Sequence, residues 1–141
     1  MCGIIQREYD HFRKVHGEHV QFVRNISLDE GQQIYFNWYW LRHCPRLPAG
    51  LDLSFFDASV NEGTFEAIKI LQHSLGLVVD GEWGPVTSSA VNRISPREAV
   101  VAFAASRLKI YEEMKAFQYF GKDWTERTER IKEASLRMID G

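Results

Sequence analysis

Helix start and stop signals recur along this chain, and they constrain its fold more than any other feature of the sequence. A serine followed three residues later by glutamate, the capping box of a helix N-terminus, occurs at Ser27 and Glu30 and again at Ser95 and Glu98. Between these signals, apolar residues recur at intervals of three and four, as on one buried face of an α-helix. No two neighbouring stretches show the alternation of paired strands. The sequence therefore predicts an all-α fold.

Six or seven helices are expected, separated by short breaks. Glycine and proline supply most of the breaks, because glycine readily ends a helix and proline cannot continue one. Phe120-Gly121 is expected to separate the last two helices. The third helix is apolar around most of its circumference, which predicts a central, buried position. The expected helices span about residues 5–15, 28–42, 51–61, 64–75, a short stretch from 85, 96–118 and 123–138.

Length and composition indicate an ordinary globular chain. A chain of 141 residues buries roughly 68–70% of its unfolded surface, so it needs no disulfide or metal to fold. The net charge of −2 argues against nucleic-acid binding driven by bulk positive charge. Cys2 and Cys44 are expected to be free thiols, and no run approaches the ~18 apolar residues of a membrane span. The chain turns polar at Gln6, which is too early for a secretory signal, so synthesis in the cytoplasm is expected.

The most specific local motif lies between Leu71-Gln72 and Thr87. Asp80-Gly81 suits a turn that needs a positive φ, and Gly84-Pro85 prepares a helix N-terminus. The conformational preferences of these residues alone predict a corner between two helices, with Trp83 as its hydrophobic plug. The stretch also resembles the Asp-Gly-x-x-Gly-Pro-x-Thr turn of bacterial peptidoglycan-binding modules.

Several motifs in order resemble the N-acetylmuramidases of glycoside hydrolase family 108, which include phage endolysins and secretion-associated muramidases. The motifs are Tyr39-Trp40, Leu47-Pro48-Ala49-Gly50-Leu51, Phe56-Asp57-Ala58-Ser59-Val60-Asn61-Glu62-Gly63 and Leu71-Gln72. The resemblance implies a lysozyme-like helical domain that recognises peptidoglycan glycan strands. It divides the chain into the C-terminal part of a muramidase-like helical region, 1–63, and a predicted peptidoglycan-binding helical region, 64–141, packed as one globular unit. It also implies a bacterial or phage origin and action at the cell wall or periplasm after release.

The chain departs from this family at the catalytic acid. In the family, the acid is a glutamate in a Glu-Gly-Gly segment, ahead of a stretch that ends in Gly-Ile. Here Met1-Cys2-Gly3-Ile4 resembles the end of that stretch, and no residue matches the acid. Cleavage needs a positioned carboxylic acid that protonates the leaving oxygen. No catalytic residue is therefore expected, since the other nearby carboxyls lie in polar helical contexts: Glu8, Asp10, Asp29 and Glu30.

Aromatic and polar side chains in the matching region are the expected glycan contacts. Asp57 and Asn61 share one face of an apolar helix, where they either line a saccharide groove or satisfy backbone groups in the core. Trp40 forms an i, i+4 pair with Phe36, and its ring either faces a sugar or packs against another helix. The groove is expected between the second and third helices and the turn around Trp83. The expected binding residues are Trp40, Asp57, Asn61, Glu62, Asp80 and Trp83.

Neither a metal nor an organic cofactor is expected. The five histidines lack His-Glu-x-x-His spacing, and the adjacency of His43 and Cys44 does not make a catalytic thiolate. Three functions remain open: glycan recognition without cleavage, which is favoured; an active N-acetylmuramidase; and a phage or secretion-system structural protein. Loss of the first segment would uncover an apolar face, through which the chain could form a homo-oligomer.

Overall fold

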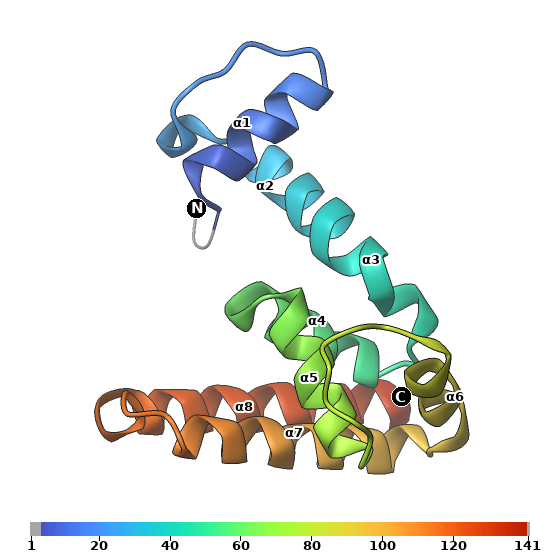
Figure 1. Ribbon diagram of the computed structural model, residues 1–141. Coiled ribbons are helices and arrows are strands. Elements are labelled where there is room, and N and C mark those ends of the chain that lie inside the picture. Colours follow the sequence, from blue (N-terminus) through green and yellow to red (C-terminus); the bar gives the residue numbers. More distant parts are fainter. Residues whose placement is uncertain (1–3, 141) are drawn as a thin grey trace. The chain divides into compact units, whose positions relative to one another are not determined.

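The computed structural model of the chain describes residues 4–140, and all regular structure in that range is helical (Figure 1). The expected all-α fold is therefore confirmed. The chain divides into two compact units, an N-terminal unit, Met1–Arg42, and a C-terminal unit, His43–Gly141. This division rests on packing and falls at a different place from the one that the family resemblance implies.

The N-terminal unit is built on two helices joined by a long segment. Its elements are α1 (Gln6–Val15), the 3₁₀ turn η1 (Val23–Asn25), α2 (Leu28–Tyr35) and the π-helical turn η2 (Phe36–Trp40), with α3 (Leu41–His43) at the junction with the next unit.

The core of this unit is formed by apolar side chains that α1 and α2 turn toward each other. Tyr9 and Phe12 of α1 are buried with Ile34 of α2. The capping box that starts α2 is confirmed, because Ser27 Oγ accepts a hydrogen bond from the amide of Glu30 at 3.1 Å. The helix expected to continue to residue 42 instead passes through η2. A π turn changes the direction of the side chains that follow it, which the α-helical period does not predict.

Five α-helices form most of the C-terminal unit over the residues that the structure describes. The two longest make a hairpin and lie side by side, α4 packs against both of them, and α5 packs on α4 and α7 (Figure 1). Leu51, Phe55 and Ala58 of α4 have no exposed surface, so the predicted central position of this helix is confirmed. The elements are η3 (Cys44–Arg46), α4 (Leu51–Glu62), α5 (Thr64–Ser74), α6 (Pro85–Arg93), α7 (Pro96–Glu112) and α8 (Phe117–Asp140).

The expected break at Phe120-Gly121 is wrong. The long helix ends at Glu112 and the next begins at Phe117, so Gly121 lies inside α8 and is buried. A Cβ on Gly121 would lie 2.8 Å from the ring of Phe117. The glycine therefore permits a close side-chain contact within α8, and does not end a helix.

Candidate functional site

The corner around Trp83 is organised by one buried amide, that of Gln72 in α5. Its Nε2 donates to Asp80 Oδ1 at 2.8 Å and to the Glu82 carbonyl at 3.0 Å. Its Oε1 accepts from the amides of Asp80 and Gly81 at 3.0 and 2.9 Å. The glutamine thus acts as a template for the turn, which explains the spacing between Gln72 and the Asp80-Gly81 pair. The sequence motif contained Gln72, but its role was not foreseen.

Asp80 belongs to this turn and is engaged by it. Besides Gln72, its carboxylate accepts from the Glu82 amide at 2.9 Å, and these hydrogen bonds lower the pKa of Asp80. Gly81 has a φ of 76°, and a Cβ there would lie 2.1 Å from the ring of Phe65. Phe65 is 55% exposed, and its ring lies against the turn at Gly81.

Trp83 is partly buried and sits among other rings. It stacks on His43 with a centroid distance of 4.9 Å, and it meets Phe55 edge-on at 6.1 Å. The Arg46 guanidinium lies 6.0 Å from the ring centroid. These contacts match the interpretation of Trp83 as the hydrophobic plug of the corner. Any sugar contact must use the part of the ring that remains exposed.

Asp57 lies between two guanidinium groups. Arg107 Nη1 donates to its Oδ2 at 2.7 Å, and Arg127 Nη2 donates to its Oδ1 at 2.6 Å. Asn61 donates from Nδ2 to the Asp57 carbonyl at 2.7 Å, one turn back along α4. Both oxygens of Asp57 are therefore occupied by partners from α7 and α8, which favours the structural interpretation of this residue.

Glu62 shares Arg107 with Asp57 but lies in a different environment. Arg107 Nη2 donates to Glu62 Oε1 at 3.1 Å. Glu62 Oε2 is buried and has no hydrogen-bond partner among residues 4–140. Burial raises the pKa of Glu62 to about 7, against the opposing effect of Arg107. Glu62 therefore changes charge near neutral pH.

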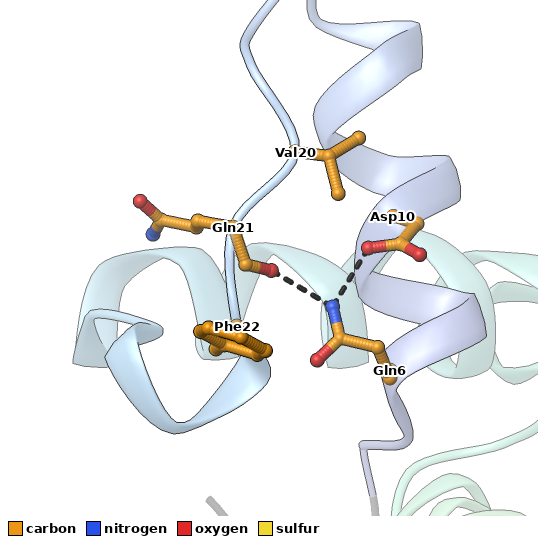
Figure 2. A pocket seen from close by; sticks show the side chains of 5 residues that line it. All are labelled: Gln6, Asp10, Val20, Gln21 and Phe22. Atoms are coloured by element: carbon orange, nitrogen blue, oxygen red, sulfur yellow. Dashed lines mark hydrogen bonds between the residues drawn. The ribbon is translucent and has the colours of Figure 1, made fainter.

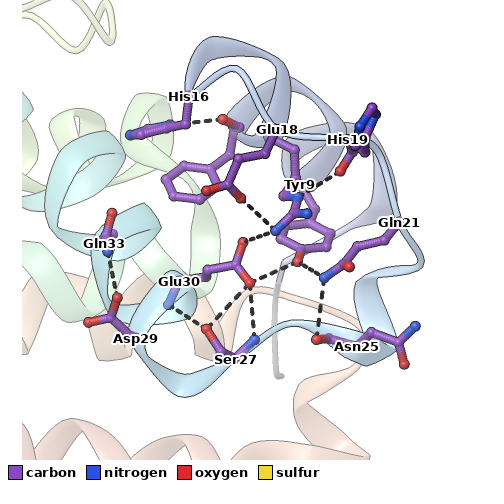
Figure 3. A network of polar contacts seen from close by, with 12 residues as sticks. Tyr9, His16, Glu18, His19, Gln21, Asn25, Ser27, Asp29, Glu30 and Gln33 are labelled. Carbon is purple, nitrogen blue, oxygen red and sulfur yellow. Dashed lines mark hydrogen bonds and ion pairs between the residues drawn. The ribbon is translucent and has the colours of Figure 1, made fainter.

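The carboxylate of Glu30 joins a polar network in the N-terminal unit (Figure 3). Tyr9 donates to Oε1 and Arg13 to Oε2, each at 3.0 Å. Burial alone would raise the pKa of Glu30, but these hydrogen bonds outweigh it and the pKa is lowered. A carboxylate that holds its charge at neutral pH is a poor proton donor.

Trp40 lies in η2 and is partly buried. It belongs to the N-terminal unit, whereas the other five expected binding residues belong to the C-terminal unit. The expected groove, which combines residues of both units, therefore stays a prediction. Met1–Gly3, which resemble the end of the stretch that follows the family's catalytic acid, lie outside the described residues.

Cys44 is buried beside α4. Burial raises the pKa of its thiol to about 12, and Asp52 adds to the effect. Such a thiol stays protonated, so it does not act as a nucleophile. Cys2 lies outside the described residues. Within residues 4–140 no group of three or more metal-binding side chains comes together.

Comparisons with known proteins agree with this helical architecture. A solved structure of SagA from Brucella abortus superposes with a TM-score of 0.82 and is 27% identical in sequence, covering 96% of this chain and 78% of that one. Such a fold defines the class of protein as a muramidase-like helical domain. Residues 1–63 match the glycosyl hydrolase 108 family. This part of the chain is therefore similar to that family. No curated protein matched the chain.

No helix between residues 4 and 140 is long and apolar enough to cross a membrane.

Proposed function

We propose that this chain recognises the glycan strands of peptidoglycan at the cell wall, and that its residues bind these strands without cleaving them. The observation that carries the proposal is the family match over residues 1–63, together with a structural similarity to SagA that extends over 96% of the chain. Fold alone does not define function. The family match therefore supports peptidoglycan as the substrate class, and the side chains carry the argument on cleavage.

The state of the carboxylates supports binding without cleavage. Glycosidases use two carboxyl groups on either side of the scissile bond, one of them protonated. Glu30 is held charged by Arg13 and Tyr9, and Asp57 is held by two arginines. Glu62 has a raised pKa, but one of its oxygens is bound by Arg107 and the other is buried. None of these three presents a free acid to a sugar.

The six expected residues take different parts in this proposal. Trp83 and Trp40 offer partly exposed aromatic surface for sugar rings. Asp80 shapes the turn that carries Trp83. Asp57 and Asn61 hold the end of α4 in place, next to Glu62.

Hydrolysis of the same strands is the second candidate, and Glu62 is the observation that favours it. A pKa of about 7 is the value that suits a general acid at neutral pH. If Glu62 protonates a leaving oxygen, E62Q abolishes the release of muropeptides while binding to the cell wall persists.

Sedimentation with purified sacculi, combined with analysis of the released muropeptides, tests both halves of the proposal. The full chain is mixed with sacculi at about 0.15 M salt, where exposed charges are screened beyond about 8 Å. We expect the protein to sediment with the sacculi and the supernatant to contain no soluble muropeptides. Failure to sediment contradicts glycan recognition. Release of muropeptides that increases with protein concentration contradicts the absence of cleavage.

A further inference from the structure

The N-terminal unit contains a pocket of about 420 Å³ that none of the expected binding residues lines (Figure 2). Gln6 and Asp10 of α1 form one side of it, and the segment 20–22 ahead of η1 forms the other. Its volume lies in the range of about 300–1,000 Å³ that is typical of small-ligand sites. The pocket therefore has room for one sugar residue.

Gln6 gives the pocket a fixed polar side. Its Nε2 donates to Asp10 Oδ1 at 2.7 Å and to the Gln21 carbonyl at 2.8 Å, as Figure 2 shows. Its Oε1 accepts from the Val23 amide at 2.8 Å. Both protons of the amide group are used within the protein. Gln6 therefore acts as a positioning residue, and it orients Asp10.

Asp10 has capacity for one more hydrogen bond. Its Oδ1 accepts from Gln6, whereas Oδ2 accepts no hydrogen bond from any residue in the range 4–140. Hydrogen bonds to a charged oxygen are roughly twice as strong as those between neutral groups. A ligand with a donor in this pocket would therefore find a strong acceptor already oriented for it.

The other side of the pocket is apolar. Val20 is 50% exposed and Phe22 is 64% exposed. The Arg24 guanidinium lies 4.9 Å from the centroid of the Phe22 ring. Much of the Phe22 side chain is still open to solvent. Covering such apolar surface is favourable, and a carboxylate beside it selects a ligand that combines an apolar part with a donor.

The segment that forms this apolar side is held in place before any ligand binds. Arg13 Nε donates to the His19 carbonyl at 2.8 Å, and the Gln21 side chain donates to Tyr9 Oη (Figure 3). Arg13 is itself paired with Glu18 at 2.7 Å. A preorganised wall lowers the entropy that binding must overcome.

We propose that this pocket binds an N-acetylated amino sugar, whose acetamido N–H donates to Asp10 Oδ2 while its methyl group and ring face pack against Val20 and Phe22. The inference rests on the proposed function, within which it names a sugar subsite. An acetamido group carries a donor and a methyl group side by side, as the pocket's carboxylate and apolar side require. A plain hydroxyl at the same place would leave the apolar side uncovered.

Titration of the full chain with short oligosaccharides tests the inference. The probes are the β-1,4-linked trimer of N-acetylglucosamine and the β-1,4-linked trimer of glucose. Calorimetry measures the affinity of each trimer, and backbone amide NMR locates its binding site. We expect the acetylated trimer to bind at least about ten-fold more tightly than the glucose trimer, because one hydrogen bond to a charged carboxylate contributes that much. Shifts should concentrate on the amides of Gln6, Val20 and Phe22. Equal affinity for the two trimers, or shifts elsewhere only, would overturn the proposal.

Two variants and a matched control sharpen this test. D10A and F22A should each weaken binding of the acetylated trimer about ten-fold, because one removes the acceptor and the other the apolar side. F22Y keeps the ring and should bind as the wild type does. The control Y119A removes an exposed aromatic side chain from the C-terminal unit and should change nothing. Unchanged affinity in D10A and F22A contradicts the inference. If either variant fails to fold, the NMR shifts of the wild type still test whether the trimer binds in the pocket.

Sedimentation with sacculi separates this inference from the proposed function. If the wild type sediments but the acetylated trimer does not bind in the pocket, the subsite is wrong and the proposed function stands. If the trimer binds in the pocket and the wild type does not sediment, the subsite stands and recognition of intact peptidoglycan is wrong.

Discussion

Arg107 of α7 and Asp57 of α4 form an ion pair of 2.7 Å, with side chains that are only 2% and 9% exposed. The same guanidinium reaches Glu62 through Nη2 and the Tyr111 hydroxyl through Nε. One buried cation thus connects α4 to α7 and also lies beside Glu62, whose pKa burial raises to about 7. A buried charge is tolerated only when it is paired and hydrogen-bonded.

Removing the charge of Asp57 should destabilise the C-terminal unit strongly. D57N leaves two guanidinium groups without their shared carboxylate, and breaking a buried ion pair in this way costs about 3–5 kcal/mol. Urea unfolding followed by circular dichroism measures the loss. The control is D140N, since Asp140 forms an exposed ion pair with Arg97 and exposed pairs contribute about 0–1 kcal/mol. Equal losses in both variants would contradict the structural role of Asp57.

The pKa of Glu62 makes a contribution to stability that depends on pH. Its folded pKa, about 7, lies above the ordinary value of 4.5, so the folded state binds the proton more tightly. This contribution is complete below about pH 4.5 and disappears as the pH rises to about 7. It amounts to at most about 3–4 kcal/mol, since one pKa unit corresponds to about 1.4 kcal/mol.

The variant E62Q isolates this contribution, because glutamine does not titrate. Between pH 5 and pH 7.5, the free energy of unfolding should fall more steeply in the wild type than in E62Q. Urea unfolding at the two pH values gives the change in the free energy of unfolding for each protein. The effects of all other carboxyls cancel when the two changes are subtracted. Parallel curves for the two proteins would show that Glu62 has an ordinary pKa.

The amide of Gln72 should be essential for the turn that carries Trp83. Q72A leaves the buried amide of Gly81 without its acceptor, and each such buried group costs about 1–3 kcal/mol. We expect faster hydrogen exchange at the amides of Asp80 and Gly81, together with a loss of stability. The control Q118A removes an exposed glutamine. Unchanged protection of the Gly81 amide in Q72A would contradict the template role.

The contact between Phe117 and Gly121 should make alanine unfavourable at position 121. Alanine is normally better than glycine in a helix by about 1 kcal/mol. Here its Cβ would meet the Phe117 ring at 2.8 Å, and overpacking costs about 1–3 kcal/mol. G121A should therefore be destabilised, and the double variant G121A/F117A should recover part of the loss. Stabilisation by G121A alone would show that the ring moves aside freely.

Local features of the sequence determined the helices. The Ser27 cap and the buried α4 depend on hydrogen bonds within one turn and on apolar spacing along one helix, and neither needs information from distant parts of the chain. The break after Glu112 lacks such a signal, and Gly121 resembles a stop while it makes room for a ring. Glycine at a helix end and glycine at a tight contact are indistinguishable in sequence, because both functions use the missing Cβ.

The state of the candidate site depended on the tertiary structure. The sequence identified Asp57 and Glu62 as interesting, but Arg107 lies 50 residues from the first of them along the chain. The pocket beside Asp10 likewise depends on a segment that folds back over α1. Hydrogen bonds, burial and pKa values at these positions are set by groups that only folding brings together. Periodicity and capping report on a few neighbouring residues, whereas electrostatics and cavities report on the assembled fold.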